Sequence, residues 1–237
     1  MFPFVSVVTP TYNRRKFIPS LIACYMSQRY PKQHMEWIIY DDGDDPVEDI
    51  FKKFEGQIPN LRYIYEEEKV NIGAKRNRLN KEARGEIIIA LDDDDFYFPE
   101  RVSAVVTAFK QHPSIQLAGS SEIYMYYSDN KEIWKLGPYN KNHATNGTMA
   151  WRRAYANSHT YDETVTHAEE KSFLDNYINP MIQLDPMKVM LVMSHSENTF
   201  DKRKMREQPN NPFVKKTDLK LRTFIKEAAL RDFFENA

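Results

Sequence analysis

The feature that most constrains this chain is a short apolar run that stops at four consecutive aspartates. The run, IIIAL at residues 87–91, has the length and β-branching of a strand buried on both faces of a sheet. Residues 92–95 then place four carboxylates side by side, and these would repel one another unless a cation lay among them. A divalent ion with oxygen ligands would meet that need, and such ions commonly hold substrate phosphates. A solvated acidic loop is the alternative.

A second strand pattern ends in the same way. Residues 37–40 (WIIY) lead directly into residues 41–45 (DDGDD). In open α/β folds, ligands bind in the crevice at the carboxyl ends of the strands. Two strand ends that carry carboxylates therefore predict one ligand site at one edge of a sheet.

Strand and helix patterns alternate through the first half of the chain. Strands are predicted at residues 5–9, 37–40, 61–65 and 87–91, and helices at residues 17–26, 47–54, 73–83 and from 99 onward. This alternation predicts an α/β fold with a mainly parallel central sheet and right-handed crossovers.

The pattern changes in the second half. Residues 115–127 and 133–136 are typical of antiparallel strands, further strand patterns lie at 148–152 and 189–193, and a helix is predicted at 169–177. Residues 217–234 predict one amphipathic helix. Its inward side chains would be Leu219, Leu221, Phe224, Ile225, Ala228 and Phe233.

The bulk composition excludes some classes of function. Lysine and arginine number 33 against 34 aspartates and glutamates, so no global charge recruits nucleic acid. Cys24 stands alone in an apolar stretch, which predicts a buried residue, excludes an internal disulfide and favours a reducing compartment. We find no signal peptide pattern and no apolar run of transmembrane length. We therefore expect a cytoplasmic protein without a transmembrane segment, and the C-terminal helix leaves peripheral attachment to a membrane open.

Four motifs occur in order at the predicted strand ends. They are VVTPTYNR at residues 7–14, DDG at 41–43, NIGAKRN at 71–77 and LDDDD at 91–95. Over about residues 4–200 the chain resembles the family 2 glycosyltransferases of the GT-A fold. The resemblance implies a nucleotide-binding half at about 1–112 and a mixed acceptor-side half at about 113–200, with a C-terminal lid or helical extension at 201–237. It also implies metal-dependent, inverting transfer of a sugar from a nucleotide-sugar donor to a glycan or other hydroxyl acceptor.

The resemblance suggests roles for the motif residues. Tyr12 would lie against the base, and Thr11 with Asp41 or Asp42 would read its edge and the ribose; packing within a turn is the alternative for Tyr12. By resemblance, Asp92 would touch the ribose and Asp94 would hold Mn²⁺ or Mg²⁺. The full set expected to bind the nucleotide sugar is Pro10, Thr11, Tyr12, Asn13, Arg14, Asp41, Asp42, Arg76, Asp92, Asp93, Trp151 and Asn198.

The acceptor side is expected in the second half. Residues 146–153 (NGTMAWRR) are similar to the segment before the family's catalytic acid, and Trp151 would either form a sugar-stacking wall or lie in the core. Residues 167–171 (HAEEK) stand where the family usually has Glu-Asp, so the second acid here is one methylene longer. We predict Glu170 as the catalytic base, with Glu169 as the alternative. Two exposed acids in the first turn of a helix would be the non-catalytic interpretation.

A late segment adds further candidates. By resemblance, His195 would complete the metal site and Asn198 would meet the diphosphate. Residues 202–204 (KRK) would close a lid over the phosphates or simply be solvated. A purely structural histidine is the alternative for His195.

Two other functions remain open on the sequence alone. A sugar-phosphate nucleotidyltransferase also combines an α/β sheet with carboxylate-bound metal, but it normally needs a glycine-rich loop where residues 10–14 (PTYNR) have none. A non-catalytic module that binds nucleotide sugars or glycans is the second. The sequence identifies neither the sugar, the donor base (UDP, GDP or dTDP), the acceptor nor the oligomeric state.

Overall fold

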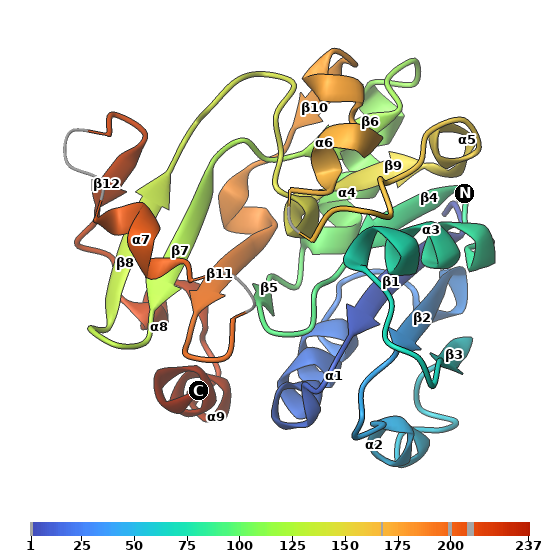
Figure 1. The fold of residues 1–237 in the computed structure, drawn as a ribbon, viewed down its shortest axis with the longest axis horizontal. Coiled ribbons are helices and arrows are strands. Elements are labelled where there is room, and N and C mark those ends of the chain that lie inside the picture. The colour runs from blue at the N-terminus through green and yellow to red at the C-terminus, as the bar shows by residue number, and fades with distance from the viewer. Residues whose placement is uncertain (1, 167, 199–200, 208–210) are drawn as a thin grey trace.

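The computed structural model describes residues 2–166, 168–198, 201–207 and 211–237. His167, which belongs to the HAEEK segment, lies outside the described residues. The described chain forms two sheets with helices packed around them (Figure 1).

The larger sheet carries the predicted parallel strands. Its order is β10-β6-β9-β4-β1-β2-β3. β1 (Val5–Thr11) pairs in parallel with both β2 (Met35–Asp41) and β4 (Ile87–Ala90), and β2 pairs in parallel with β3 (Leu61–Tyr65). β9 (Ala150–Arg152) runs antiparallel to both β4 and β6 (Leu117–Gly119), and β10 (Met181–Gln183) lies parallel to β6.

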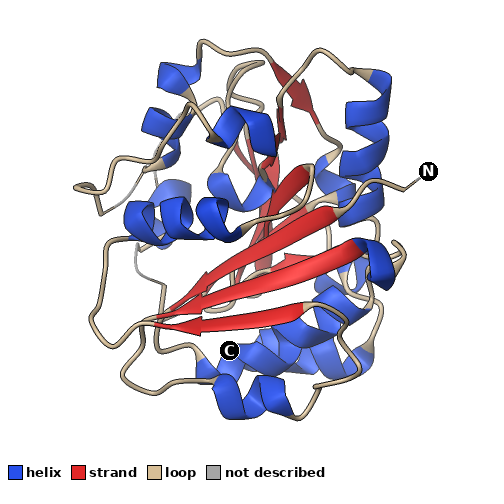
Figure 2. Ribbon diagram, turned by 90° about the vertical axis from the view of Figure 1, so that its right-hand side faces the viewer, coloured by secondary structure: helices blue, strands red, loops and turns tan. Residues whose placement is uncertain are grey.

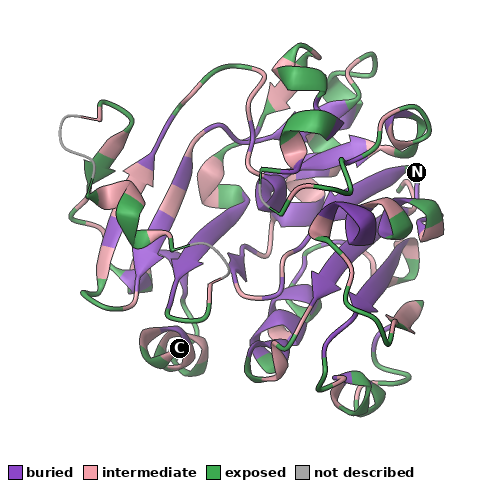
Figure 3. Ribbon diagram, viewed as in Figure 1, coloured by how far each residue is buried: buried purple, intermediate pink, exposed green. Residues whose placement is uncertain are grey.

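Helices cover both faces of this sheet, as the view in Figure 2 shows. Successive strand residues point to opposite faces. Val7, Trp37 and Ile89 pack with α1 (Ile18–Met26), α2 (Glu48–Lys52) and α4 (Arg101–Gln111). Val8, Ile38 and Ile88 pack instead with α3 (Ile72–Glu82) and α6 (Glu170–Phe173). The central strands are therefore buried on both sides (Figure 3), which explains their unbroken apolar sequences.

The smaller sheet belongs to the second half of the chain. Its order is β12-β8-β7-β11-β5. β7 (Ile123–Tyr127) pairs antiparallel with β8 (Glu132–Leu136) and in parallel with β11 (Met190–Ser194). The edges are β5 (Phe96–Tyr97) and β12 (Val214–Lys216). Short helices complete the described fold: α5 (Arg153–Ala156), α7 (Arg203–Arg206), α8 (Leu221–Phe224) and α9 (Ala228–Asn236).

The predicted α/β architecture is confirmed, and Cys24 is buried as expected. The single C-terminal helix over 217–234 was wrong. β12 ends just before this range, and two separate helices, α8 and α9, follow it. The helices are separate because Ile225 and Glu227 adopt extended backbone between them. Ala228 is exposed, and Phe234 takes the fully buried position that the helical pattern gave to Phe233.

The predicted helix over 169–177 is also shorter than expected. It ends after the single turn of α6 and continues as a 3-10 turn, Asp175–Tyr177, in left-handed backbone. β5, β10 and β12 were not predicted, since two or three residues carry too little periodic pattern.

Candidate active site

The two acidic segments meet at one edge of the larger sheet. β1 lies between β2 and β4, so the carboxyl ends of these strands are neighbours. Lys75 at the start of α3 pairs with Asp42 and donates to the Thr11 carbonyl at the end of β1. Arg14, which follows β1, lies 3.9 Å from the carboxylates of both Asp93 and Asp94. The predicted convergence of strand-end aspartates is therefore present in the structure.

Asp41 folds the loop that follows β2. Its Oδ1 accepts from the Gly43 backbone N–H at 2.9 Å, and its Oδ2 accepts from the Val47 N–H at 3.0 Å and from the Tyr63 hydroxyl at 2.5 Å. The side chain is buried and these contacts occupy both oxygens. This corrects the expectation that Asp41 could read the base or ribose.

Asp42 belongs to a buried ion pair with Lys75. The other carboxylate oxygen accepts from the Val70 backbone N–H at 2.8 Å, and the lysine ammonium also donates to the Thr11 carbonyl at 3.2 Å. The pair thus connects the end of β1, the end of β2 and the segment that leads into α3. Removing one partner of such a buried ion pair strongly destabilises the fold, because the other charge stays buried and uncompensated.

Asp94 and His195 lie side by side although 101 residues separate them. Asp94 Oδ2 is 3.2 Å from His195 Nε2, and the Asn198 amide nitrogen is 3.2 Å from the same oxygen. The imidazole is almost fully enclosed and its ring lies 4.6 Å from that of Phe17. Sequence spacing alone would not reveal this approach, and the structure brings the predicted metal pair together.

These two side chains fit a divalent ion only in part. A carboxylate oxygen and an imidazole nitrogen suit Mn²⁺ or Mg²⁺. Among the described residues, however, no group of three or more His, Cys, Asp and Glu side chains could hold a metal ion. The pair therefore suits an ion whose remaining ligands come from elsewhere, such as the oxygens of a diphosphate.

Cations surround the acidic loop. Arg14 Nε lies 3.9 Å from the carboxylates of both Asp93 and Asp94, and its Nη2 donates to the Glu197 carbonyl at 2.7 Å. Lys202 donates to the Met193 carbonyl at 2.9 Å and lies 4.0 Å from Asp95. Lys202 thus contacts the site, whereas Arg203 pairs with its neighbour Asp201.

Asp93, Asp94 and Asp95 differ sharply in proton affinity. Burial and the nearby Asp94 carboxylate raise the pKa of Asp93 to about 8, and burial raises that of Asp95 to about 7. Burial acts in the same direction on Asp94, but Lys202 and His195 outweigh it and hold its pKa below the ordinary value. Among these three side chains, the carboxylate that faces His195 therefore holds its negative charge most readily.

Arg76 joins the acidic loop to the acceptor-side half. Its Nη1 lies 3.2 Å from Asp92 Oδ1, and its Nε donates to Glu169 Oε1 at 2.8 Å. In the amide orientation that satisfies both neighbours, Asn146 accepts from Arg76 at 2.7 Å and donates to the Tyr161 hydroxyl at 2.7 Å. Arg76, expected among the residues that bind the nucleotide sugar, is buried and paired with two carboxylates.

Glu170 lies next to this network, but the ion pairs of Arg76 go to Asp92 and Glu169 and not to Glu170. It opens α6, and burial together with the adjacent Glu169 carboxylate raises its pKa to about 7. Glu169 itself is buried and bound by Arg76. A carboxylate with a pKa near neutrality is suited to general base catalysis.

The backbone around α6 is unusual. Ala168 before it has φ 55°, and Asp175, Asn176 and Tyr177 after it have φ of 47°, 54° and 64°. Non-glycine residues rarely adopt this conformation, and such strain is concentrated at functional sites. The left-handed backbone on both sides of α6 fixes where this short helix begins and ends.

The remaining predicted residues lie either in the core or around the end of β1. Trp151 is 1 % exposed and donates to Asn80 at 3.0 Å, so of its two expected roles the structure supports the core residue and not the sugar-stacking wall. Tyr12 is half-buried, with the Lys69 ammonium 3.9 Å above its ring. Pro10 and Thr11 are buried at the end of β1, and Asn13 turns the chain with φ 53°.

Lys75, Asn146 and Tyr161 were missed as site residues. Lys75 and Asn146 lie within quoted motifs, but a lysine in a basic helix gives no sign that it will be buried against a distant aspartate. Tyr161 stands in no motif. Its contact with Asn146 exists only once the chain has folded.

Known proteins resemble this chain in sequence and in fold. The model of the family Glycosyl transferase family 2 matches residues 6–173. Glycosyltransferase AglE of Haloferax volcanii is 34% identical over 93 residues, which is 39% of this chain and 31% of AglE. The poly(ribitol-phosphate) beta-N-acetylglucosaminyltransferase TarS of Staphylococcus aureus is 31% identical over 111 residues, which is 46% of this chain and 19% of TarS. The chain therefore spans less than a third of each of these relatives.

Solved structures share the fold. TarS 1-349 in complex with UDP-GlcNAc has a TM-score of 0.66 at 22% identity, over 82% of this chain and 59% of that one. The mannosyltransferase PcManGT of Pyrobaculum calidifontis, in complex with GDP-Man and Mn²⁺, has a TM-score of 0.64 at 15% identity, over 84% and 59%. No helix among the described residues is long and apolar enough to cross a bilayer. By its fold and by the match over residues 6–173, the chain belongs to the family 2 glycosyltransferases.

Proposed function

We propose that this protein is a metal-dependent, inverting glycosyltransferase that moves a sugar from a nucleotide-sugar donor to the hydroxyl of a glycan or another acceptor. The donor would lie across the carboxyl ends of β1, β2 and β4. Tyr12 would contact the base, and Asp92 would contact the ribose through the oxygen that Arg76 leaves free. The known complexes of structural neighbours support a uridine or guanosine diphosphate sugar.

Asp94 and His195 would hold the divalent ion, with Asn198 beside them. When bound, such an ion offsets the negative charge that builds on the departing diphosphate. Arg14 and Lys202 add fixed positive charge at the same place, because both lie close to the acidic loop. These cations would hold the diphosphate while the bond to the sugar breaks.

Glu170 would act as the base. The acceptor oxygen forms a bond to the anomeric carbon as the bond from that carbon to the diphosphate oxygen breaks on the opposite face. The acceptor's hydroxyl proton passes to the Glu170 carboxylate. Glu169 would position Arg76, and so α6, since its carboxylate is already bound by that guanidinium.

One observation carries this proposal. The ion-pair network of Asp92, Arg76 and Glu169 connects the acidic loop to the helix that bears Glu170. The network brings a carboxylate with a near-neutral pKa beside the residues that resemble the family's donor site. A nucleotidyltransferase or a non-catalytic module has no corresponding need for such a base.

The test compares Glu170→Gln with Glu169→Gln. With UDP-GlcNAc or GDP-mannose and Mn²⁺, wild type should hydrolyse one donor slowly, and the sugar first released should have inverted anomeric configuration by NMR. Glu170→Gln should lower this rate by about 10²–10⁴-fold, the usual contribution of a general base, while still binding the donor. An unimpaired Glu170→Gln enzyme, or a retained configuration, would refute the mechanism. If Glu169→Gln alone were crippled, the base would be Glu169.

A further inference from the structure

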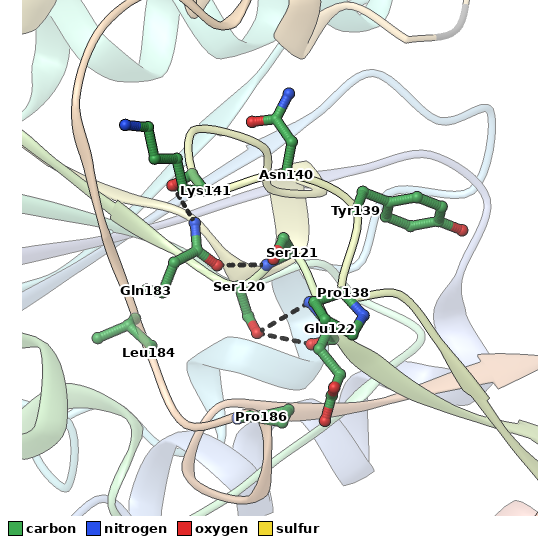
Figure 4. Close-up of a pocket in the computed structure, with 10 residues that line it drawn as sticks. All are labelled: Ser120, Ser121, Glu122, Pro138, Tyr139, Asn140, Lys141, Gln183, Leu184 and Pro186. Atoms are coloured by element: carbon green, nitrogen blue, oxygen red, sulfur yellow. Dashed lines mark hydrogen bonds between the residues drawn. The ribbon is translucent and has the colours of Figure 1, made fainter. Parts of the chain in front are cut away.

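An open pocket of about 410 Å³ lies in the acceptor-side half (Figure 4). Its walls come from three segments: residues 120–122 between β6 and β7, residues 138–141 after β8, and the chain from Gln183 at the end of β10 to Pro186. None of the residues placed above at the donor, the metal pair or the base lines it. The pocket is thus a separate feature of the fold.

Hydrogen bonds hold these walls together. The Gln183 side chain accepts from the Ser121 backbone N–H at 2.8 Å and donates to the Lys141 carbonyl at 2.8 Å. Figure 4 shows both contacts, with the Asn140 and Lys141 side chains extending from the same short segment. The pocket therefore has a defined shape before any ligand arrives.

A short stretch of chain connects the pocket to the active site. Lys141 lines the pocket, and six residues later Gly147 lies against the acidic loop. A Cβ on Gly147 would come within 2.9 Å of Asp92 Oδ2, so the backbone passes immediately beside that carboxylate. The distance along the chain between the pocket and the acidic loop is therefore small.

A column of aromatic rings makes the same connection. The ring of Tyr139, which lines the pocket, is 5.3 Å from that of Phe213 and 5.0 Å from that of His143. His143 in turn stacks on Tyr177 at 5.0 Å. Tyr177 closes the left-handed turn after α6, the helix that begins with Glu170. The column thus runs from the element bearing the base to the rim of the pocket.

The chemistry of the walls suits a sugar. Proline and tyrosine carbons offer apolar surface for the C–H face of a pyranose, while amide and hydroxyl groups can meet its hydroxyls. Glu122 pairs with Lys135 at 2.8 Å, so this carboxylate is compensated. We propose that the pocket binds a sugar unit of the acceptor, at a position removed from the reacting hydroxyl, and that the acceptor is therefore an extended glycan. This inference rests on the proposed function.

The test measures how oligosaccharide length affects binding. Cello-, chito- and manno-oligosaccharides, from one sugar unit to about six, are titrated by saturation-transfer difference NMR. Wild type should bind the longer members of at least one series more tightly than the monosaccharide. Tyr139→Ala and Lys141→Ala should each weaken that binding by about tenfold, the factor that corresponds to 1.4 kcal/mol. The matched controls are Phe2→Ala and Lys110→Ala, which remove an exposed ring and an exposed lysine away from the pocket.

Each outcome decides the inference. Equal affinity for short and long oligosaccharides, or undiminished binding by both pocket variants, would overturn it. Donor hydrolysis by wild type is measured separately and needs no glycan. A protein that hydrolyses donor without any preference for length would lose this inference alone, whereas one that prefers long glycans but never turns over a donor would lose the proposed reaction.

Discussion

Asp42 and Lys75 show how much a single buried pair can determine. The lysine ammonium has burial working against its charge, and Asp42 is the carboxylate that compensates it. Asp42→Ala should therefore lower the free energy of unfolding by about 3–5 kcal/mol, because it leaves an uncompensated buried charge. Urea denaturation of Asp42→Ala and of the double variant Asp42→Ala, Lys75→Met tests this. The double variant should be the more stable of the two, and the reverse order would show that the pair is not the cause.

Glu170 should make both catalysis and stability depend on pH. The reaction needs its carboxylate form, so the rate should rise as pH increases to about 7 and level off above it. This rising limb should persist in Glu169→Gln. The residual rate of Glu170→Gln should lack it, and a limb of equal size in that variant would remove the base assignment.

The same residue should make the free energy of unfolding change with pH in the opposite direction to the rate. The folded pKa of Glu170 lies above the ordinary value of 4.5, so the folded state holds this proton more tightly than the unfolded state does. The contribution of Glu170 to the free energy of unfolding should therefore decrease as pH rises from about 4.5 through about 7. Glu170→Gln should escape this loss and be more stable than wild type above pH 7, as thermal melts at pH 5 and pH 8 would show.

At the scale of elements, α9 packs beside the Phe17 ring that contacts His195. In α9, Phe234 is fully buried against Phe96. The half-buried Phe233 packs at a near right angle to the Phe17 ring, which in turn contacts the His195 ring in a tilted arrangement. Phe234→Ala should cost about 3–5 kcal/mol of unfolding free energy, as is usual for a buried phenylalanine. Phe233→Ala should cost clearly less. Equal losses in urea denaturation would instead favour the continuous helix with Phe233 inward.

Elements differ in how far the sequence predicts them. β1, β2 and β4 were recoverable because strands buried on both faces need unbroken apolar sequences. The division of α8 from α9 was not, since Ile225 suits a helix by pattern but is extended between the two helices. The same holds for α6, whose length is limited by a left-handed turn of ordinary residues rather than by glycine or proline.

At the scale of the whole molecule, donor binding should couple both halves of the chain. Asp94 follows β4, and His195 follows β11 in the other sheet. A nucleotide sugar with Mn²⁺ at 100 times its dissociation constant should stabilise the fold by about 2.7 kcal/mol. Differential scanning fluorimetry with UDP-GlcNAc and GDP-mannose, each with Mn²⁺ or EDTA, measures this shift. Asp94→Ala should abolish the metal-dependent part of it, and a shift equal to wild type would exclude Asp94 as a ligand.

The sequence by itself determined the sheet, the family and the acidic strand ends, because these depend on local periodicity and on motifs contiguous in the chain. The tertiary structure alone decided which of the predicted side chains are already bound or buried within the protein. The carboxylate of Asp41 accepts hydrogen bonds from the loop that follows it, Glu169 is bound by Arg76, and Trp151 is enclosed in the core. Partners far apart in sequence determine burial and charge compensation, and no local pattern records which of them will meet. That Glu170 lies beside the ion pairs of Arg76 without joining them is therefore visible only in the folded protein.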